Sequence, residues 1–158
     1  METTLRMATV DDTQNLIKAR FDYFAAEKWE VSPEQYELIR SSLERYIPKH
    51  LNIDFFAALV EENNKIVSLA FLVILEKPAN LSFPTGKNGL ILNVLTYPEY
   101  RKRGFATTAM NALIEEAKRQ NLSYIELSSS ESGKTLYQKL GFREREPSRF
   151  TEMRLSLL

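Results

Sequence analysis

The stretch LILNVLTYPEYRKRGFA at residues 90–106 joins a nearly continuous apolar run to a glycine through three successive cations. Continuous apolar runs are typical of strands that are buried on both faces, so residues 90–95 predict a central strand. Apolar side chains at helical spacing follow, and they predict a helix over residues 104–120. The segment RKRG at 101–104 is therefore a turn between a buried strand and a helix.

This turn and the first residues of the predicted helix are suited to bind an anion. N–H groups in the first turn of a helix have no partner within the helix, and the helix dipole favours negative charge there. Gly104 has no Cβ and Ala106 is small, so a phosphate can approach the backbone closely. Arg101, Lys102 and Arg103 supply charge for two phosphate groups. Taken alone, the turn leaves two interpretations open, a phosphate site and a solvated basic turn.

The segments before residue 90 predict strands and two helices. The second helix has the clearer start, because Ser32 can cap it, Pro33 fits its first turn and Gln35 completes a capping box. The expected elements are a strand at 3–6, a helix from Asp11-Asp12 to Glu27, a helix from Ser32 to Pro48, and a hairpin of strands at 55–60 and 66–75 before a loop at 76–88.

The segments after residue 120 complete a β-α-β unit. Ile125-Glu126-Leu127 predicts a strand parallel to the central one, joined to it by a right-handed crossover. Residues 133–140 predict a short helix, and residues 142–146 and 150–157 predict a final hairpin. The fold class is therefore α+β, a three-layer α/β arrangement around a mixed sheet.

Length and composition limit the class of protein. At 158 residues the chain is expected to form one domain over residues 1–158. Lysine plus arginine equals aspartate plus glutamate at 21 each, whereas a nucleic-acid binder usually has a basic excess, so we expect no nucleic-acid partner. No apolar stretch approaches the roughly 20 residues that span a bilayer, and no signal peptide is visible, so we expect no membrane partner and a cytoplasmic location.

Two residue types limit the chemistry. Cysteine is absent, which excludes disulfides, thiolate nucleophiles and thiolate metal sites. His50 is the one histidine, so a metal site built from several histidines is excluded and no metal is expected. His50 follows a predicted helix end, where a cation is favoured, and we expect a surface or capping role for it.

The segment YPEYRKRGFATTAMNALIEEA resembles the pyrophosphate-binding segment of the GCN5-related N-acetyltransferase (GNAT) superfamily. The signature of that segment is arginine or glutamine, two residues, glycine, one residue, and glycine or alanine, which Arg101, Gly104 and Ala106 match. ILNVLTYP resembles the fourth strand of the family, and LYQKLGF at 136–142 resembles its closing helix and turn. The resemblance implies the GNAT acyl-CoA N-acyltransferase fold, with a mixed central sheet whose fourth and fifth strands splay apart.

The resemblance also implies acetyl-CoA as cosubstrate and an amine acceptor, either a small molecule or a peptide, and it leaves a homodimer open. The backbone of Val94, Leu95 and Thr96 would pair with the pantetheine arm. Ser130 stands where the family often has asparagine and could contact the arm, or it could cap the following helix. The backbone residues implied at the pyrophosphate are Arg101, Lys102, Arg103, Gly104, Phe105 and Ala106.

The chemistry of this family assigns roles to particular groups. Tyr137 matches the tyrosine near the CoA sulfur, and a phenol of pKa ~10 suits protonation of the leaving thiolate, although it could instead be a packing residue. The N–H of Val94 is the expected donor to the oxyanion. Since the chain has no cysteine, direct transfer in a ternary complex is preferred over an acetyl-enzyme.

The general base and the acceptor are less well defined. Glu126 is the candidate carboxylate, and the alternatives are a base acting through water and a solvated strand residue. Asn93 either orients the substrate or marks a bulge. Trp29 belongs to a mixture of aromatic and acidic residues at 21–37 that would suit a cationic amine, unless this is an ordinary amphipathic pair of helices. The alternative function is a non-catalytic acyl-CoA-binding or sensing module of the same fold.

Overall fold

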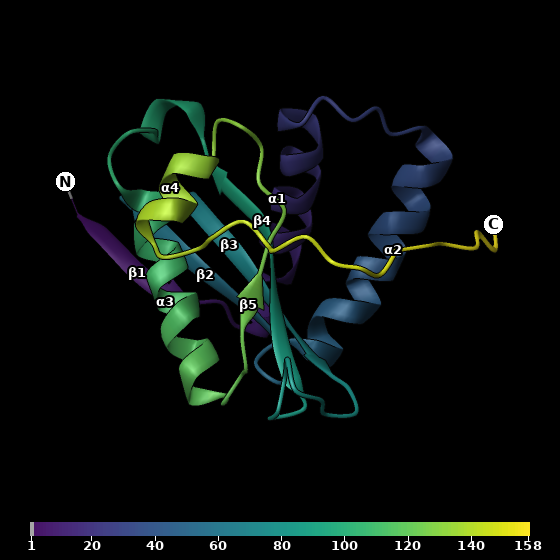
Figure 1. Ribbon diagram of the computed structural model, residues 1–158. Helices are drawn as coiled ribbons and strands as arrows, with labels where there is room; N and C mark the ends of the chain where they lie inside the picture. The colour runs from purple at the N-terminus through teal and green to yellow at the C-terminus, as the bar shows by residue number, and fades with distance from the viewer. Residues whose placement is uncertain (1) are drawn as a thin grey trace. The chain divides into compact units, whose positions relative to one another are not determined.

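The computed structural model describes residues 2–158, which form two compact units. The first unit ends at Ser128 and the second spans Ser129–Leu158. The first unit is a five-stranded sheet with helices on both of its faces (Figure 1). This confirms the predicted α+β class with a mixed sheet, whereas a single domain over residues 1–158 stays a prediction.

The strands of the sheet follow one another in the order β1-β2-β3-β4-β5. The first four are antiparallel, and β5 pairs parallel with β4 after the crossover through helix α3, as predicted. The strands are Thr3–Met7 (β1), Phe55–Glu62 (β2), Lys65–Glu76 (β3), Lys87–Thr96 (β4) and Ile125–Glu126 (β5).

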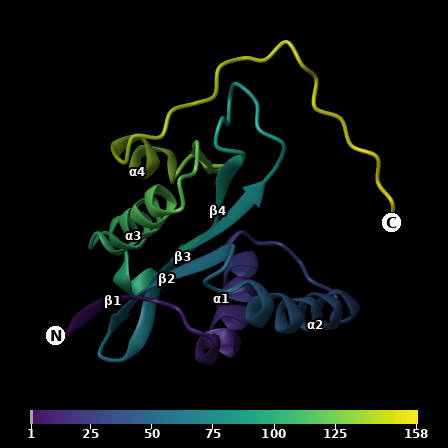
Figure 2. The ribbon, with the colours of Figure 1, turned by 90° about the horizontal axis from the view of Figure 1, so that it is seen from below.

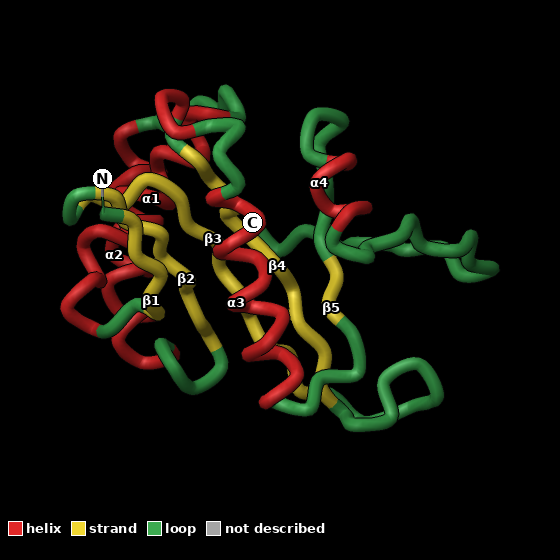
Figure 3. The backbone as a smooth tube through the Cα atoms, turned by 90° about the vertical axis from the view of Figure 1, so that its left-hand side faces the viewer, coloured by secondary structure: helices red, strands yellow, loops and turns green. Residues whose placement is uncertain are grey.

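Helices cover the two faces of this sheet. Figure 2 shows α3 on one side of the strands and α1 with α2 on the other, and Figure 3 shows the same division from the side. The helices are Thr13–Ala26 (α1), Pro33–His50 (α2) and Phe105–Arg119 (α3), with short 3-10 helices at Val10–Asp12 and Pro98–Tyr100.

The two ends of α2 show what the sequence predicted and what it did not. The capping box is confirmed, because the Gln35 N–H donates to Ser32 Oγ at 3.1 Å and the Ser32 N–H donates to Gln35 Oε1 at 2.9 Å. The predicted end at Pro48 is wrong, because the helix continues to His50. Proline removes one intrahelical hydrogen bond, and only the last turn lies beyond it. His50 in that turn is partly exposed, with Nδ1 2.7 Å from Asp54 Oδ1.

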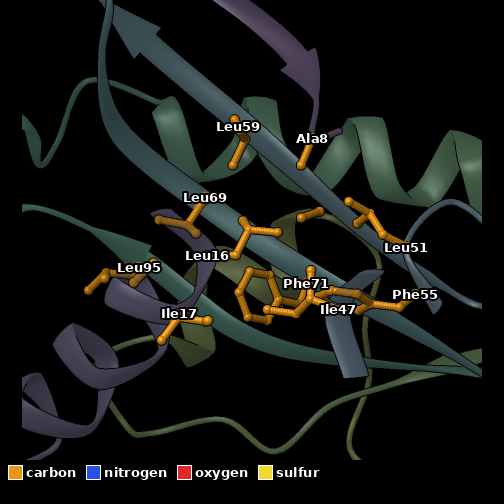
Figure 4. Packing of buried hydrophobic residues seen from close by; sticks show 12 residues of the cluster. Ala8, Leu16, Ile17, Ile47, Leu51, Phe55, Leu59, Leu69, Phe71 and Leu95 are labelled. Atoms are coloured by element: carbon orange, nitrogen blue, oxygen red, sulfur yellow. The ribbon is translucent and has the colours of Figure 1, made fainter. Parts of the chain in front are cut away.

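The core of the first unit lies between the sheet and the layer of α1 and α2. In Figure 4, Leu16 and Ile17 of α1 lie against Leu69, Phe71 and Leu95 of the sheet, and all five are buried. Burying a large apolar side chain stabilises the fold by roughly 1.5–3 kcal/mol. The opposite face of the sheet is covered by buried residues of α3, namely Phe105, Ala109, Met110, Leu113 and Ala117.

The second unit contains the short helix α4 (Lys134–Lys139), close to the predicted range. Gly141 follows it with φ of 101°, and the ring of Tyr137 meets that of Phe142 edge-on at a centroid distance of 6.1 Å. The predicted final hairpin is wrong, because residues 142–158 form no strand in the described structure. Its first arm, residues 142–146, carries four successive charged residues and has no apolar face to bury, and an isolated two-stranded hairpin is only marginally stable in water.

Among residues 2–158, the helices are too short or too polar to cross a membrane.

Candidate functional site

A bulge interrupts the pairing of β4 with β3 at the middle of β4. Leu92 pairs with Phe71 and Leu95 pairs with Leu69, so Asn93 and Val94 stand opposite the single residue between those partners. Asn93 takes the left-handed conformation with φ of 55°, which asparagine tolerates better than most residues. Of the two interpretations of Asn93, the bulge is therefore confirmed. A bulge of this kind turns the backbone groups that follow it.

The edge of β4 beyond its first residues is not covered by β5. Within the first unit, β5 pairs with β4 at Gly89–Ile125 and Leu90–Glu126 and no further (Figure 3). The β5 side of β4 over residues 91–96 therefore lies outside the described ladder. This is the predicted splay, and it leaves backbone N–H and C=O groups that an extended chain can pair with.

The turn after β4 ends at a glycine that begins α3. Gly104 is the N-cap residue with φ of 81°, and a Cβ placed on it would meet no atom within 4 Å in the structure of residues 2–158. Lys102 in the same turn also has a positive φ, of 63°. As described, the first turn of α3 contains no acidic residue, and its N-cap glycine has no side chain to accept from the N–H groups. The predicted turn thus has the open approach that an anion needs.

Two of the three cations in the turn contact the sheet. Arg103 donates to both carboxylate oxygens of Glu62, at 2.6 and 3.1 Å, and its guanidinium lies 4.7 Å from the centroid of the Phe105 ring. The side chain of Glu62 is 4% exposed, at the end of β2. The hydrogen bonds from Arg103 hold the pKa of the Glu62 carboxyl below its usual value. Arg101 donates through Nε to the Thr96 carbonyl at 3.1 Å.

Side chains of α1 contact the bulge of β4 and Tyr97, the residue after the strand. Arg20 donates to Asn93 Oδ1 at 3.3 Å, and the Asn93 Nδ2 donates to the Ala19 carbonyl at 3.4 Å. Tyr97 Oη donates to Asp22 Oδ2 at 2.5 Å. Burial, with the hydrogen bond to Asp22, raises the pKa of Tyr97 above its ordinary value. The side chain of Asn93 is therefore held by α1.

The aromatic residues predicted at the acceptor side form a cluster of their own. Trp29 is 56% exposed and lies against Phe24 and Tyr23, with ring centroids 5.5 and 5.9 Å away. The Phe21 ring meets Tyr36 of α2 at 4.5 Å. Trp29 as a substrate contact stays a prediction.

The remaining predicted residues lie on β5 and in the second unit. Glu126 pairs with Leu90 of β4. Leu90 lies three positions before Asn93, so the two residues are about 10 Å apart along the strand at roughly 3.3 Å per residue. Ser130 accepts from the Gly133 N–H through Oγ at 3.3 Å in the turn before α4, but the N-cap of α4 is Gly133 and no side chain caps the helix, so the predicted capping role of Ser130 is wrong. Tyr137 also belongs to the second unit. The cofactor contacts of Ser130 and Tyr137 and the base role of Glu126 stay predictions.

The family model described as "Acetyltransferase (GNAT) family" matches residues 14–142. The chain belongs to this family. It is therefore an acetyl-CoA-dependent N-acetyltransferase, and the predicted family and fold are confirmed. The comparison with curated proteins found no match.

Solved structures support the fold of this GNAT protein along its whole length. A predicted acetyltransferase from Clostridium acetobutylicum, solved with acetyl-CoA, has 29% identity and a TM-score of 0.84, with 97% of this chain and 96% of that chain covered. A GCN5-related N-acetyltransferase from Ralstonia eutropha JMP134 has 21% identity and a TM-score of 0.80, at 98% and 99% coverage. Glucosamine-6-phosphate N-acetyltransferase from Arabidopsis thaliana has 17% identity and a TM-score of 0.66, at 98% and 100% coverage.

Sequence reasoning missed two residues that contact the candidate site, Arg20 and Glu62. Arg20 lies four residues after Leu16 and four before Phe24, so it interrupts the apolar stripe of α1, and this charge at a buried position was a signal that could have found it. Glu62 is the last residue of β2, next to the turn Asn63-Asn64, where an acidic residue is ordinary. Nothing in the sequence pairs Glu62 with Arg103, which is 41 residues away.

Proposed function

We propose that the protein transfers an acetyl group from acetyl-CoA to a primary amine, directly and within a ternary complex. One observation carries this proposal: a strand with a bulge and an uncovered edge leads into an open helix N-terminus. The bulge at Asn93 and the N-cap at Gly104 are fixed in one continuous segment of the first unit. An extended pantetheine arm followed by a diphosphate has the shape and charge that this segment can bind.

The residues of β4 and of the turn hold the two parts of the cosubstrate. The backbone of Val94, Leu95 and Thr96 pairs with the amides of the pantetheine arm along the uncovered edge. The N–H groups at the start of α3 hold the diphosphate, and the open space at Gly104 admits it. Lys102 and Arg101 add positive charge, and Arg103 positions the turn through its ion pair with Glu62.

The chemical step needs an oxyanion donor, a general acid and a general base. Acetyl-CoA supplies a thioester carbonyl as the electrophile. The N–H of Val94, the second residue of the bulge, stabilises the oxyanion that forms when the amine attacks. Tyr137 protonates the leaving thiolate, and Glu126, directly or through water, accepts the proton of the attacking amine. Support for these roles comes from the bulge and from the family motif around Tyr137.

The assay for this function is release of CoA thiol from acetyl-CoA in the presence of a panel of primary amines. Because the chain contains no cysteine, a thiol-specific reagent reports only the CoA that is released. We expect at least one amine to raise thiol release well above the rate of acetyl-CoA hydrolysis. Intersecting initial-velocity lines are expected for a ternary complex, and parallel lines would indicate an acetyl-enzyme instead. Tight binding of acetyl-CoA without turnover of any amine would contradict the proposed transfer and would support the non-catalytic acyl-CoA-binding module instead.

A further inference from the structure

Arg20 is a largely buried arginine without a carboxylate partner. Its guanidinium lies between the Asn93 amide, at 3.3 Å, and the Phe24 ring, whose centroid is 4.9 Å away. Among residues 2–158, the ion pairs include other arginines, such as Arg6, Arg40 and Arg103, but not Arg20. Burial lowers the pKa of Arg20, because the charged form loses water there.

The Arg20 guanidinium in this position has further N–H donors besides the one that bonds to Asn93. The Asn93 oxygen is a neutral acceptor and takes one N–H, whereas arginine carries several N–H groups in a planar fork that matches an oxyanion. A charge taken out of water without an opposite charge is unfavourable, and such groups are usually paired. The described protein therefore gives this guanidinium a neutral acceptor and an aromatic ring but no carboxylate partner.

The surroundings of Arg20 do not supply that partner. Asp22, two residues along α1, is already bonded to Lys18 Nζ at 2.6 Å and to Tyr97 Oη at 2.5 Å. On α2, both Glu37 and Glu44 bond to Arg40. These three carboxylates are bonded to other side chains, and in the structure of residues 2–158 no ion pair joins Arg20 to a carboxylate.

Arg20 also lies beside the part of β4 that the proposed reaction uses. It contacts Asn93, the residue immediately before Val94, whose N–H stabilises the oxyanion in the proposed reaction. The aromatic cluster of Phe24 and Trp29 continues from Arg20. An acceptor lying against this cluster meets a cation of the protein, which favours a negative group there rather than a positive one.

We propose that the amine acceptor carries an oxyanion, a carboxylate or a phosphate, and that Arg20 binds this group beside the β4 bulge. The proposal rests on the proposed acetyltransferase function and names its substrate class. The amine end of the acceptor faces Val94, and the oxyanion end is held by the guanidinium. This differs from the cationic amine that the aromatic and acidic residues at 21–37 were expected to bind.

The test compares amines in matched pairs that differ only in the oxyanion. Amino acids are paired with their carboxamides, and phosphoethanolamine is paired with ethanolamine, so that the carboxylate and the phosphate are examined separately. We expect kcat/KM to be roughly tenfold to a hundredfold higher for the oxyanion member of at least one pair, the range of a charge-assisted hydrogen bond. The pair with the larger ratio identifies the group that Arg20 binds.

Variants then assign the preference to Arg20. R20Q should bring the ratio of kcat/KM to about one by slowing the reaction of the oxyanion amine alone, and R20K should keep part of the preference. R40Q should leave the ratio unchanged, because Arg40 has two carboxylate partners of its own. The ratio does not depend on how much of a variant is folded, since unfolding lowers both rates by one factor. A wild-type ratio near one for every pair overturns the proposal, as does a ratio that R20Q preserves. If no amine, with or without an oxyanion, raises thiol release, the proposed function itself is overturned.

Discussion

At Asn93, Lys102 and Gly104 the backbone takes φ values of 55°, 63° and 81°. The left-handed region is unfavourable for residues with a Cβ, by roughly 1–2 kcal/mol each, so natural chains use it where the local geometry requires it. Here these conformations mark the bulge of β4 and the turn into α3. Positive φ values also occur outside the proposed cosubstrate site, as at Lys28 and Asn52, but within it they shape both the bulge and the turn.

The ion pair between Arg103 and Glu62 should set how well the turn binds acetyl-CoA. E62Q removes the charge that holds Arg103, and the dissociation constant for acetyl-CoA is expected to rise roughly 3- to 10-fold, as for one net hydrogen bond. Calorimetric titration measures this constant. The control is E61Q, because Glu61 pairs with Arg6 instead. Equal affinities of wild type, E62Q and E61Q would show that the pair has no positioning role.

The hydroxyl of Tyr137 should matter for turnover more than for binding. Y137F removes the proton that protonates the thiolate and keeps the ring that meets Phe142. We expect kcat to fall by about 10²- to 10⁴-fold, the usual contribution of a general acid, with the affinity for acetyl-CoA retained. Steady-state kinetics and calorimetry separate the two quantities. A variant with the wild-type kcat would restrict Tyr137 to packing.

Asp12 should make the stability of the fold depend on acidic pH. Its carboxylate, 7% exposed, accepts from both Arg6 Nη groups at 2.8 Å and from the Thr9 N–H at 2.8 Å, and the Arg6 bonds lower its pKa from the ordinary 3.8. The folded state therefore binds a proton less readily than the unfolded state does. The stabilisation is present above the unfolded-state pKa and is lost as the pH falls through the folded-state pKa.

The pH dependence is measured by urea unfolding of wild type and D12N. At neutral pH, D12N should lower the free energy of unfolding by about 1–2 kcal/mol. The difference between the two proteins should shrink as the pH falls from about 5 to 2, because wild-type Asp12 becomes protonated there. A difference that stays constant across this range would mean that the Asp12 charge does not stabilise the fold.

At the scale of elements, the capping box of α2 provides a direct test of local stability. S32A removes the oxygen that accepts from the Gln35 N–H, and it should lower the free energy of unfolding by about 0.5–2 kcal/mol. The matched control is S42A, since Ser42 is exposed within the same helix and alanine favours the helix there. Urea unfolding compares them, and an S32A protein as stable as wild type would show that the cap is dispensable.

Elements with a strong local signal were predictable, and those that depend on a partner were not. The start of α2 follows from Ser32, Pro33 and Gln35 alone, and β4 follows from its apolar run. The prediction that α2 ends at Pro48 was wrong because a proline near the last turn disturbs few hydrogen bonds. Residues 153–157 have alternating apolar positions, but a strand also needs an edge to pair with, which its own sequence does not provide.

At the scale of the whole molecule, the binding segment was predictable and its support was not. Arg101, Gly104 and Ala106 carry a motif within six residues, so the turn and the family could be inferred from the sequence. The contacts of Arg103 with Glu62 and of Arg20 with Asn93 join residues 41 and 73 positions apart. Such pairs arise only when the sheet and its helices assemble.

The claim that the start of α3 holds the diphosphate of acetyl-CoA is tested most directly by calorimetric titration of a series at Gly104. G104A adds backbone strain, G104Q also adds bulk, and G104E adds a negative charge to the same bulk. The added side chains enter space that the fold leaves open. Circular dichroism checks that each variant is folded. We expect the affinity for acetyl-CoA to fall in that order, with binding to G104E lost. Wild-type affinity in folded G104E would contradict the account.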